Sequence, residues 1–181
     1  MVVHTSGTTG APKRVEHSRA AVLASVEDTL SHWNLSAGTR ALLALPTSFV
    51  AGQAMLVRGL VGAWDLELIE PSSAPFWNDA KDFAALTPHQ AQGWIATGSG
   101  TTSKLLLGGG PVSKTLLKAL LDSGRVDEVW ESYGLSETLT HVATRKLGTV
   151  EDLQSPFHPL PSVTIGSSED GLSLIHISEP T

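Results

Sequence analysis

Short apolar segments alternate along this chain with segments of helical spacing, and this alternation limits the possible folds more than any other feature. Residues 41–45 form a short apolar run that stops at Pro46, and residues 105–107 form another that runs into glycines. Such runs are typical of buried strands. Between them, apolar residues recur every three or four positions, as in amphipathic helices. The pattern predicts a layered α/β fold with a mainly parallel sheet flanked by helices.

Local start signals place the expected helices. Ser18, Thr87 and Ser113 each precede a helical pattern and are good N-cap residues. Pro88 suits the first helical position after Thr87, and Gly124 is expected to end the helix that follows Ser113. The other expected elements are strands at residues 66–69 and 129–133 and a helix at residues 52–61.

Composition and charge exclude several kinds of partner. The 181 residues carry a formal net charge of -6, so we expect no nucleic-acid partner. We find neither a run of about 18 apolar residues, as a membrane span needs, nor the pattern of a secretory leader. The absence of cysteine excludes disulfides, thiolate metal sites and a cysteine nucleophile. We expect a cytoplasmic protein that binds small molecules; the sequence does not indicate its oligomeric state.

A dense polar segment at residues 5–13 packs two glycines, four hydroxyl side chains and one lysine into nine positions. Glycines allow backbone N–H groups to converge on an anion, hydroxyl groups donate further hydrogen bonds, and the lysine adds a positive charge. We therefore expect phosphate binding by Thr5, Ser6, Gly7, Thr8, Thr9, Gly10 and Lys13. The alternative is a polar turn without a ligand, since Gly, Ser and Thr clusters are common in loops.

The spacing of this segment differs from that of the nucleoside-triphosphate P-loop. That motif places a lysine directly after its second glycine and a Ser or Thr next. Here Lys13 lies three residues beyond Gly10 and is followed by Arg14. The difference excludes the simplest kinase interpretation, and transfer of phosphate to a hydroxyl group is further disfavoured because no base is evident beside an acceptor site.

The polar segment resembles the signature loop of the adenylate-forming (AMP-binding) superfamily, which comprises acyl-CoA synthetases, luciferases and peptide-synthetase adenylation domains. A second motif of that superfamily, Tyr-Gly-x-Ser/Thr-Glu, is matched at residues 133–137. The resemblance implies that the chain is part of the large N-terminal domain, that Glu137 holds Mg²⁺ and that Tyr133 stacks on adenine. A carboxylate and an aromatic ring suit these tasks. By the same resemblance, further nucleotide contacts come from Ser132, Gly134 and Ser136.

Taken alone, this second motif would also fit a solvated glutamate and a packed tyrosine at the end of a strand. A third match is the triplet Gly108, Gly109 and Gly110, which in the superfamily passes close to the adenine. Glycine suits this position because backbone without side chains approaches a flat ring closely. Alone, the triplet would equally fit a turn into the next helix.

Within the superfamily, residues 46–58 resemble the segment that lines the acid pocket of the o-succinylbenzoate–CoA ligase family of menaquinone synthesis. The resemblance implies an acid pocket formed by Phe49, Gly52, Gln53, Arg58 and His141. Phe49 is a departure, since many relatives place histidine there. Arg58 would pair with the second carboxylate of the acid, because a guanidinium suits a carboxylate; the alternative is an exposed helix arginine. His141 would line the pocket or be a packed or surface histidine.

The resemblance implies an enzyme that uses ATP, Mg²⁺ and coenzyme A to convert a carboxylic acid into an acyl-AMP and then a CoA thioester, with Lys13 and Glu137 in the catalytic roles. Other acyl- or aryl-CoA ligases, adenylation domains and a non-catalytic nucleotide-binding module remain alternatives. The superfamily also needs an aspartate and a C-terminal lysine, both expected beyond Gly171. We therefore expect no turnover by the chain as given.

Both ends of the chain suggest missing sequence. Only a strand stub, residues 1–4, precedes the polar segment, and we expect residues 1–171 to be an incomplete AMP-binding N-terminal domain. The last ten residues, 172–181, match codon by codon the translation of a transposase adapter used in sequencing libraries. The alternative is a short strand, since residues 172–177 alternate in polarity.

Overall fold

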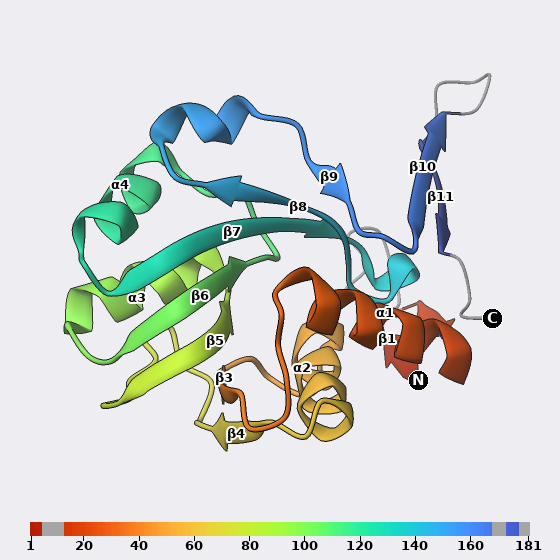
Figure 1. Cartoon of the computed structure of the whole chain (residues 1–181), viewed down its shortest axis with the longest axis horizontal. Coiled ribbons are helices and arrows are strands. Elements are labelled where there is room, and N and C mark those ends of the chain that lie inside the picture. The colour runs from red at the N-terminus through yellow and green to blue at the C-terminus, as the bar shows by residue number, and fades with distance from the viewer. Residues whose placement is uncertain (5–12, 168–172, 178–181) are drawn as a thin grey trace.

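The computed structural model describes residues 1–4, 13–167 and 173–177 and shows a seven-stranded sheet with helices on both faces (Figure 1). Two small two-stranded sheets, β1–β2 and β10–β11, lie beside it. The helices are α1 Arg19–His32, α2 Val50–Val61, α3 Pro88–Thr97, α4 Lys114–Asp122 and the short 3₁₀ helices η1 Ser136–Thr138 and η2 Val150–Gln154. The strands are β1 Val2–His4, β2 Arg14–Glu16, β3 Arg40–Leu43, β4 Asp65–Leu68, β5 Ala80–Leu86, β6 Thr101–Leu107, β7 Val126–Gly134, β8 His141–Leu147, β9 His158–Pro159, β10 Val163–Ser167 and β11 Ser173–Ile177.

The large sheet is mainly parallel, as the sequence predicts. Its strand order is β4-β3-β5-β6-β7-β8-β9. The strands from β4 to β7 pair in parallel, and β8 and β9 add to the far edge in antiparallel orientation. The carboxyl ends of the parallel strands therefore meet at one edge, which is where ligands bind in sheets of this kind.

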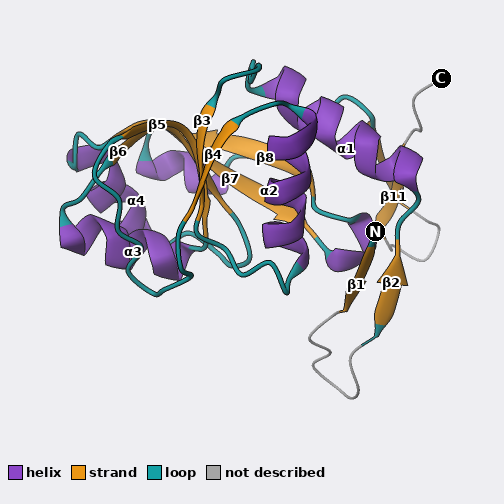
Figure 2. Cartoon of the chain, turned by 90° about the horizontal axis from the view of Figure 1, so that it is seen from below, coloured by secondary structure: helices purple, strands orange, loops and turns teal. Residues whose placement is uncertain are grey.

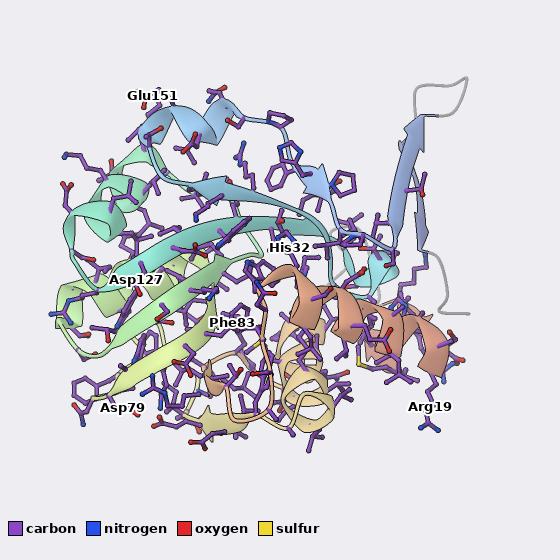
Figure 3. All side chains as sticks on the ribbon, in the orientation of Figure 1. Arg19, His32, Asp79, Phe83, Asp127 and Glu151 are labelled. Carbon is purple, nitrogen blue, oxygen red and sulfur yellow. The ribbon has the colours of Figure 1, made fainter. Side chains whose placement is uncertain are left out.

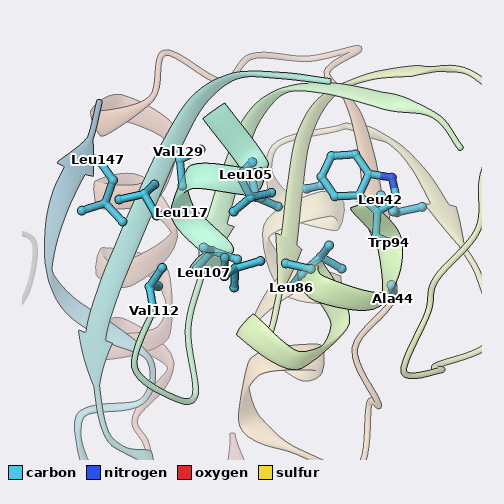
Figure 4. Packing of buried hydrophobic residues seen from close by; sticks show 14 of the residues in the cluster. Leu42, Ala44, Leu86, Trp94, Leu105, Leu107, Val112, Leu117, Val129 and Leu147 are labelled. Carbon is cyan, nitrogen blue, oxygen red and sulfur yellow. The ribbon is translucent and has the colours of Figure 1, made fainter. Parts of the chain in front are cut away.

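Helices lie on both faces of the large sheet (Figure 2), and alternate residues of the central strands pack against different helices. Leu42 and Ala44 belong to a core with α3 and α4, whereas Ala41 and Leu43 belong to a second core with α1 and α2. Figure 4 shows the first core, in which the rings of Trp94 and Trp77 stack with centroids 4.8 Å apart. Burial on both faces explains why these strands are continuous apolar runs rather than alternating ones.

Many charged side chains lie at the periphery, and a group of aromatic rings fills the interior next to α1 and α2. Figure 3 shows Arg19, Asp79 and Glu151 at the edge of the molecule and Phe83 near its centre. Phe83 lies between Trp33 and Trp64, with ring centroids 5.6 and 5.7 Å away. These rings fill the space between the sheet and α1 and α2, and so fix the position of both helices.

The predicted helix starts are confirmed by their caps. The Ser18 hydroxyl accepts a hydrogen bond from the Ala21 N–H at 3.0 Å, and Ser113 caps α4 in the same way. Thr87 forms a reciprocal capping box with Gln90 at the start of α3. These bonds satisfy N–H groups that have no partner within the helix.

Several strands were not expected from the sequence, and β5 is the most important of them. It lies in the centre of the sheet between β3 and β6. Its first half contains Lys81, which is buried but forms ion pairs with Glu67 and Asp79. A lysine in a strand pattern argues against burial unless its partners are known, and one of these partners, Glu67, comes from another strand, β4.

The C-terminal segment Ser173–Ile177 forms β11, which pairs antiparallel with β10. Any alternating segment of this length is able to form such a pair. The adapter interpretation of residues 172–181 therefore stays a prediction. Among the described residues, no helix has the length and apolar character that crossing a membrane requires.

We predict that Leu117→Ala lowers the free energy of unfolding by about 3 kcal/mol, because Leu117 is fully buried between α4 and the sheet and its removal leaves a cavity. Leu60→Ala is the matched control, since Leu60 is 80% exposed on α2, and we expect a change below about 0.5 kcal/mol. Urea unfolding followed by circular dichroism measures both. Similar losses in the two variants would contradict this assignment of the core.

Candidate active site

A pocket of about 350 Å³ opens at the carboxyl ends of the parallel strands. The residues after β3, β5 and β6, the end of β7 and one side of α2 form its walls. Seven of the residues singled out in the sequence line it: Arg58, Gly108, Gly109, Ser132, Gly134, Ser136 and His141. Most of the remaining wall is apolar and includes Leu45, Val50, Met55, Leu86, Leu106 and Leu135. One cavity thus collects residues from the glycine triplet, the second motif and the expected acid pocket.

The glycine triplet approaches β7 so closely that a side chain at its first position would require the Ser132 hydroxyl to move. The Ser132 hydroxyl donates a hydrogen bond to the Leu107 carbonyl at 2.9 Å. A Cβ atom at Gly108 would lie 2.7 Å from the same hydroxyl oxygen. Gly109 has φ of +78°, a conformation that favours glycine. Gly110 does not line the pocket, and a Cβ atom there would meet nothing within 4 Å.

A buried ion pair holds the backbone after the triplet. The Glu131 carboxylate accepts a hydrogen bond from the Val112 N–H at 3.2 Å and another from Arg145 Nε at 2.8 Å. Arg145 also donates to the carbonyls of Leu153 and Ser155. This network joins the triplet, β7, β8 and η2. Sequence reasoning missed it, although a glutamate in the middle of an apolar strand pattern is a signal for a buried partner.

Gly134 is required where β7 ends. A Cβ atom there would lie 2.6 Å from the carbonyl carbon of Thr140. The pairing of β7 with β8 shifts register between Tyr133 and Gly134, so the chain turns at this point into η1. The turn brings Ser136 to the pocket wall.

Tyr133 and Glu137 lie beside the pocket but not on its wall. Tyr133 is 46% exposed, and its ring packs against Phe157 at 6.0 Å. The Arg145 guanidinium lies 4.4 Å from the centre of the Phe157 ring on which Tyr133 packs. Glu137 is exposed on η1 and forms no ion pair with any other described residue. Both side chains are therefore accessible to a ligand.

Thr5, Ser6, Gly7, Thr8, Thr9 and Gly10 lie outside the described residues. The strands on either side of them, β1 and β2, pair antiparallel, and Lys13 is exposed directly before β2. His17, which follows β2, lies with Nε2 2.7 Å from the Ser136 carbonyl oxygen. This contact ties the paired strands β1 and β2 to η1.

Arg58 is 3% exposed on α2, so the alternative of an exposed helix arginine is wrong. Its Nη2 donates a hydrogen bond to Thr140 Oγ1 at 3.0 Å and lies 3.5 Å from His141 Nδ1. Among the described residues, its Nε has no hydrogen-bond partner and no carboxylate forms an ion pair with it. Within that part of the chain, a cation thus borders the pocket without a counter-ion.

Burial lowers the pKa of Arg58 from its ordinary value to about 10. The unfolded chain keeps the ordinary pKa, so at neutral pH the buried charge destabilises the folded state by about 3 kcal/mol, a cost relieved only as the pH rises above the folded pKa. Buried charges of this kind are normally paired. An anionic ligand in the pocket would supply the missing partner.

The periodicity of α2 explains why the other acid-pocket candidates do not line this cavity. Ala51, Met55 and Arg58 share one helix face toward the pocket, and Gly52 and Gln53 point to other faces. A Cβ atom at Gly52 would lie 2.6 Å from the Pro46 carbonyl carbon, so this glycine permits close packing of the helix. Phe49 is the N-cap residue of α2 and is 54% exposed.

Comparison with known proteins agrees with this geometry. The family model of the AMP-binding enzymes matches residues 1–166. The chain belongs to this family. Among curated AMP-binding proteins, a 2-succinylbenzoate–CoA ligase of Bacillus cereus is 28% identical over 153 residues, which cover 79% of this chain and 31% of that protein. The chain therefore spans about a third of the length of the curated relatives it matches.

Solved structures show the same fold. The structure of an acyl-CoA synthetase (AMP-forming)/AMP-acid ligase II-like protein from Dyadobacter fermentans matches 97% of this chain and 55% of its own, with a TM-score of 0.78 and 31% identity. The O-succinylbenzoate coenzyme A synthetase of Bacillus subtilis, solved with AMP, matches 96% of this chain and 37% of its own, with a TM-score of 0.80 and 23% identity. The sheet and helices described above are thus the fold of AMP-binding enzymes.

We predict that Arg58→Met raises the free energy of unfolding at neutral pH by about 2 kcal/mol, because it removes a buried charge that has no counter-ion. Arg19→Met is the matched control; Arg19 is exposed at the start of α1, and we expect almost no change. Urea unfolding of the ligand-free chain measures both. A destabilised Arg58→Met variant would show instead that the described hydrogen bonds alone compensate the charge.

Proposed function

We propose that this chain binds ATP and a carboxylic acid in the pocket, as the nucleotide- and acid-binding part of an AMP-forming acid–CoA ligase. The observation that carries the proposal is the union, in one cavity, of a glycine-lined wall and a buried arginine without a counter-ion. The first suits a flat base and phosphates, and the second suits an anionic acid. Membership in the AMP-binding family supports the nucleotide.

The proposed reaction has two steps. An oxygen of the substrate carboxylate attacks the α-phosphorus of ATP, the bond to pyrophosphate breaks, and an acyl-AMP forms. The thiol of coenzyme A then attacks the acyl carbonyl, AMP leaves, and the thiol proton passes to solvent. No protein nucleophile is needed, so the protein contributes by positioning the reactants and by stabilising negative charge.

The proposed roles follow the chemistry of each group. The hydroxyl and N–H groups of residues 5–10 and the charge of Lys13 hold phosphate. Gly108 and Gly109 admit the adenine to the wall that Ser132 supports. The exposed ring of Tyr133 is free to stack on the base.

Glu137 suits Mg²⁺, since its exposed carboxylate is a hard oxygen ligand. The described residues contain no cluster of three side chains able to hold a metal ion. Phosphate oxygens and water would therefore complete the coordination shell, which is how Mg²⁺ commonly binds with ATP. The bound ion would neutralise part of the negative charge of the phosphates.

For the acid, we propose o-succinylbenzoate or a similar acid that carries a second carboxylate. Arg58 would pair with the carboxylate that does not react, and Met55 and Leu106 would pack against the apolar part of the acid. The support is the buried charge on the wall of an otherwise apolar pocket, together with the name of the Bacillus cereus relative. An acid with one carboxylate would leave Arg58 without a counter-ion.

We predict that, with AMP present, the chain binds o-succinylbenzoate at least about tenfold more tightly than 3-benzoylpropanoate, the same acid without its ring carboxylate, because only the former supplies a partner for Arg58. Arg58→Met should abolish this difference and leave AMP affinity unchanged. Isothermal titration calorimetry measures both ligands. Equal affinities for the two acids in the wild type would contradict the proposed acid, and absence of AMP binding would contradict the nucleotide site.

We predict that Gly108→Ala weakens AMP binding by about tenfold, because the added Cβ atom would lie 2.7 Å from Ser132 Oγ and must displace the serine or the glycine-lined wall. Gly148→Ala is the control, since a Cβ atom there lies at an ordinary 3.6 Å from Asp152. Both variants should retain wild-type circular dichroism. Unchanged AMP affinity in Gly108→Ala would show that the nucleotide does not use this wall.

A further inference from the structure

A chain of hydrogen bonds runs from α1 through His141 to Arg58. The Thr29 side chain, fully buried on α1, donates its hydroxyl hydrogen to the Ser25 carbonyl at 2.9 Å. The same oxygen lies 3.2 Å from His141 Nε2. On the other side of the ring, His141 Nδ1 lies 3.5 Å from Arg58 Nη2. Three elements, α1, α2 and the start of β8, thus meet at the buried cation.

These contacts favour one tautomer of His141. With the single hydroxyl hydrogen of Thr29 directed at the Ser25 carbonyl, the Thr29 oxygen is able to accept a hydrogen bond from Nε2. In that tautomer Nδ1 keeps a lone pair, which faces Arg58 Nη2 and lies 3.4 Å from Thr140 Oγ1. The ring is neutral because burial and the positive charge of Arg58 hold the pKa of His141 well below its usual value.

We propose that Thr29 and His141 are positioning residues that aim the Arg58 guanidinium at the anionic group of the acid, an inference that rests on the proposed function of this pocket. His141 offers an acceptor without a negative charge. Arg58 is thus oriented by His141 Nδ1 and Thr140 Oγ1 and keeps its full charge for the ligand. A carboxylate in place of the histidine would neutralise the arginine and compete with the acid.

The surroundings of His141 support this role. Its ring packs edge-on against Trp33 at 5.4 Å, so the ring has little freedom to rotate away from Arg58. Thr29 has no exposed surface and does not line the pocket, so it acts on the ligand only through the histidine. The pattern of the sequence gives no sign of this link, since residues 29 and 141 lie on different elements far apart in the chain.

The affinity experiment uses the whole chain with AMP present. Thr29→Val removes the acceptor of His141 with little change of shape, and we expect o-succinylbenzoate to bind about tenfold more weakly while AMP affinity is unchanged. Thr29→Ser keeps the hydroxyl and should restore wild-type affinity. Thr144→Val is the matched control, because Thr144 is also buried and lies 3.2 Å from another histidine, His32, in a contact that involves neither Thr29 nor Arg58.

Equal acid affinities in the wild type and Thr29→Val would overturn this inference alone. Absence of acid binding already in the wild type would overturn the proposed function as well.

A second measurement reads the histidine directly and does not depend on whether the variant folds. Long-range ¹H–¹⁵N NMR correlations of His141 in the wild type should show a neutral ring with hydrogen on Nε2. A ring with hydrogen on Nδ1, or a charged ring at neutral pH, would overturn the proposal. In Thr29→Val we expect the spectrum to change, whereas in Thr144→Val it should not.

Discussion

Burial of the central parallel strands on both faces is the constraint on which the rest of the structure depends. Helices α1 and α2 cover one face and α3 and α4 the other, so the carboxyl-terminal halves of β3, β5 and β6 consist of apolar side chains. The polar residues of these strands, such as Lys81 and Lys104, lie in their amino-terminal halves, and the glycines of the pocket follow the end of β6. Because the strands are parallel, their carboxyl ends meet at one edge, and the pocket forms there.

Two sets of charged side chains near this edge, the Glu131–Arg145 pair and Arg58, differ in whether the described residues supply a counter-ion. Glu131 and Arg145 are paired with each other and saturated by backbone groups, which makes them a rigid support for the glycine triplet. Arg58 has only neutral partners. A charge that is satisfied within the fold contributes to structure, whereas a charge left without a counter-ion lowers stability and is available to a ligand. The same edge of the sheet thus holds the paired Glu131 and Arg145, which support the glycine triplet, and Arg58, which has no described counter-ion.

The sequence predicted the fold class and the local elements well because these depend on nearby residues. The caps at Ser18, Thr87 and Ser113 are contacts within three residues, and the apolar run before Pro46 is a local pattern. Strand β5 was missed because Lys81 is compensated by Glu67 from another strand. The site was predicted in part: family motifs indicated the glycine wall and Arg58, but not Glu131 or Thr29, whose roles depend on partners distant in sequence.

The orientation of α2 determines which of the acid-pocket candidates line the cavity. Phe49, Gly52 and Gln53 are near Arg58 in sequence, yet the residues of α2 that line the pocket are Val50, Ala51, Met55 and Arg58. Gly52 acts through packing against Pro46, which sets how closely α2 approaches the strand end. Gly52 thus allows α2, which carries Arg58, to pack closely against the segment that follows β3, although this glycine does not line the pocket.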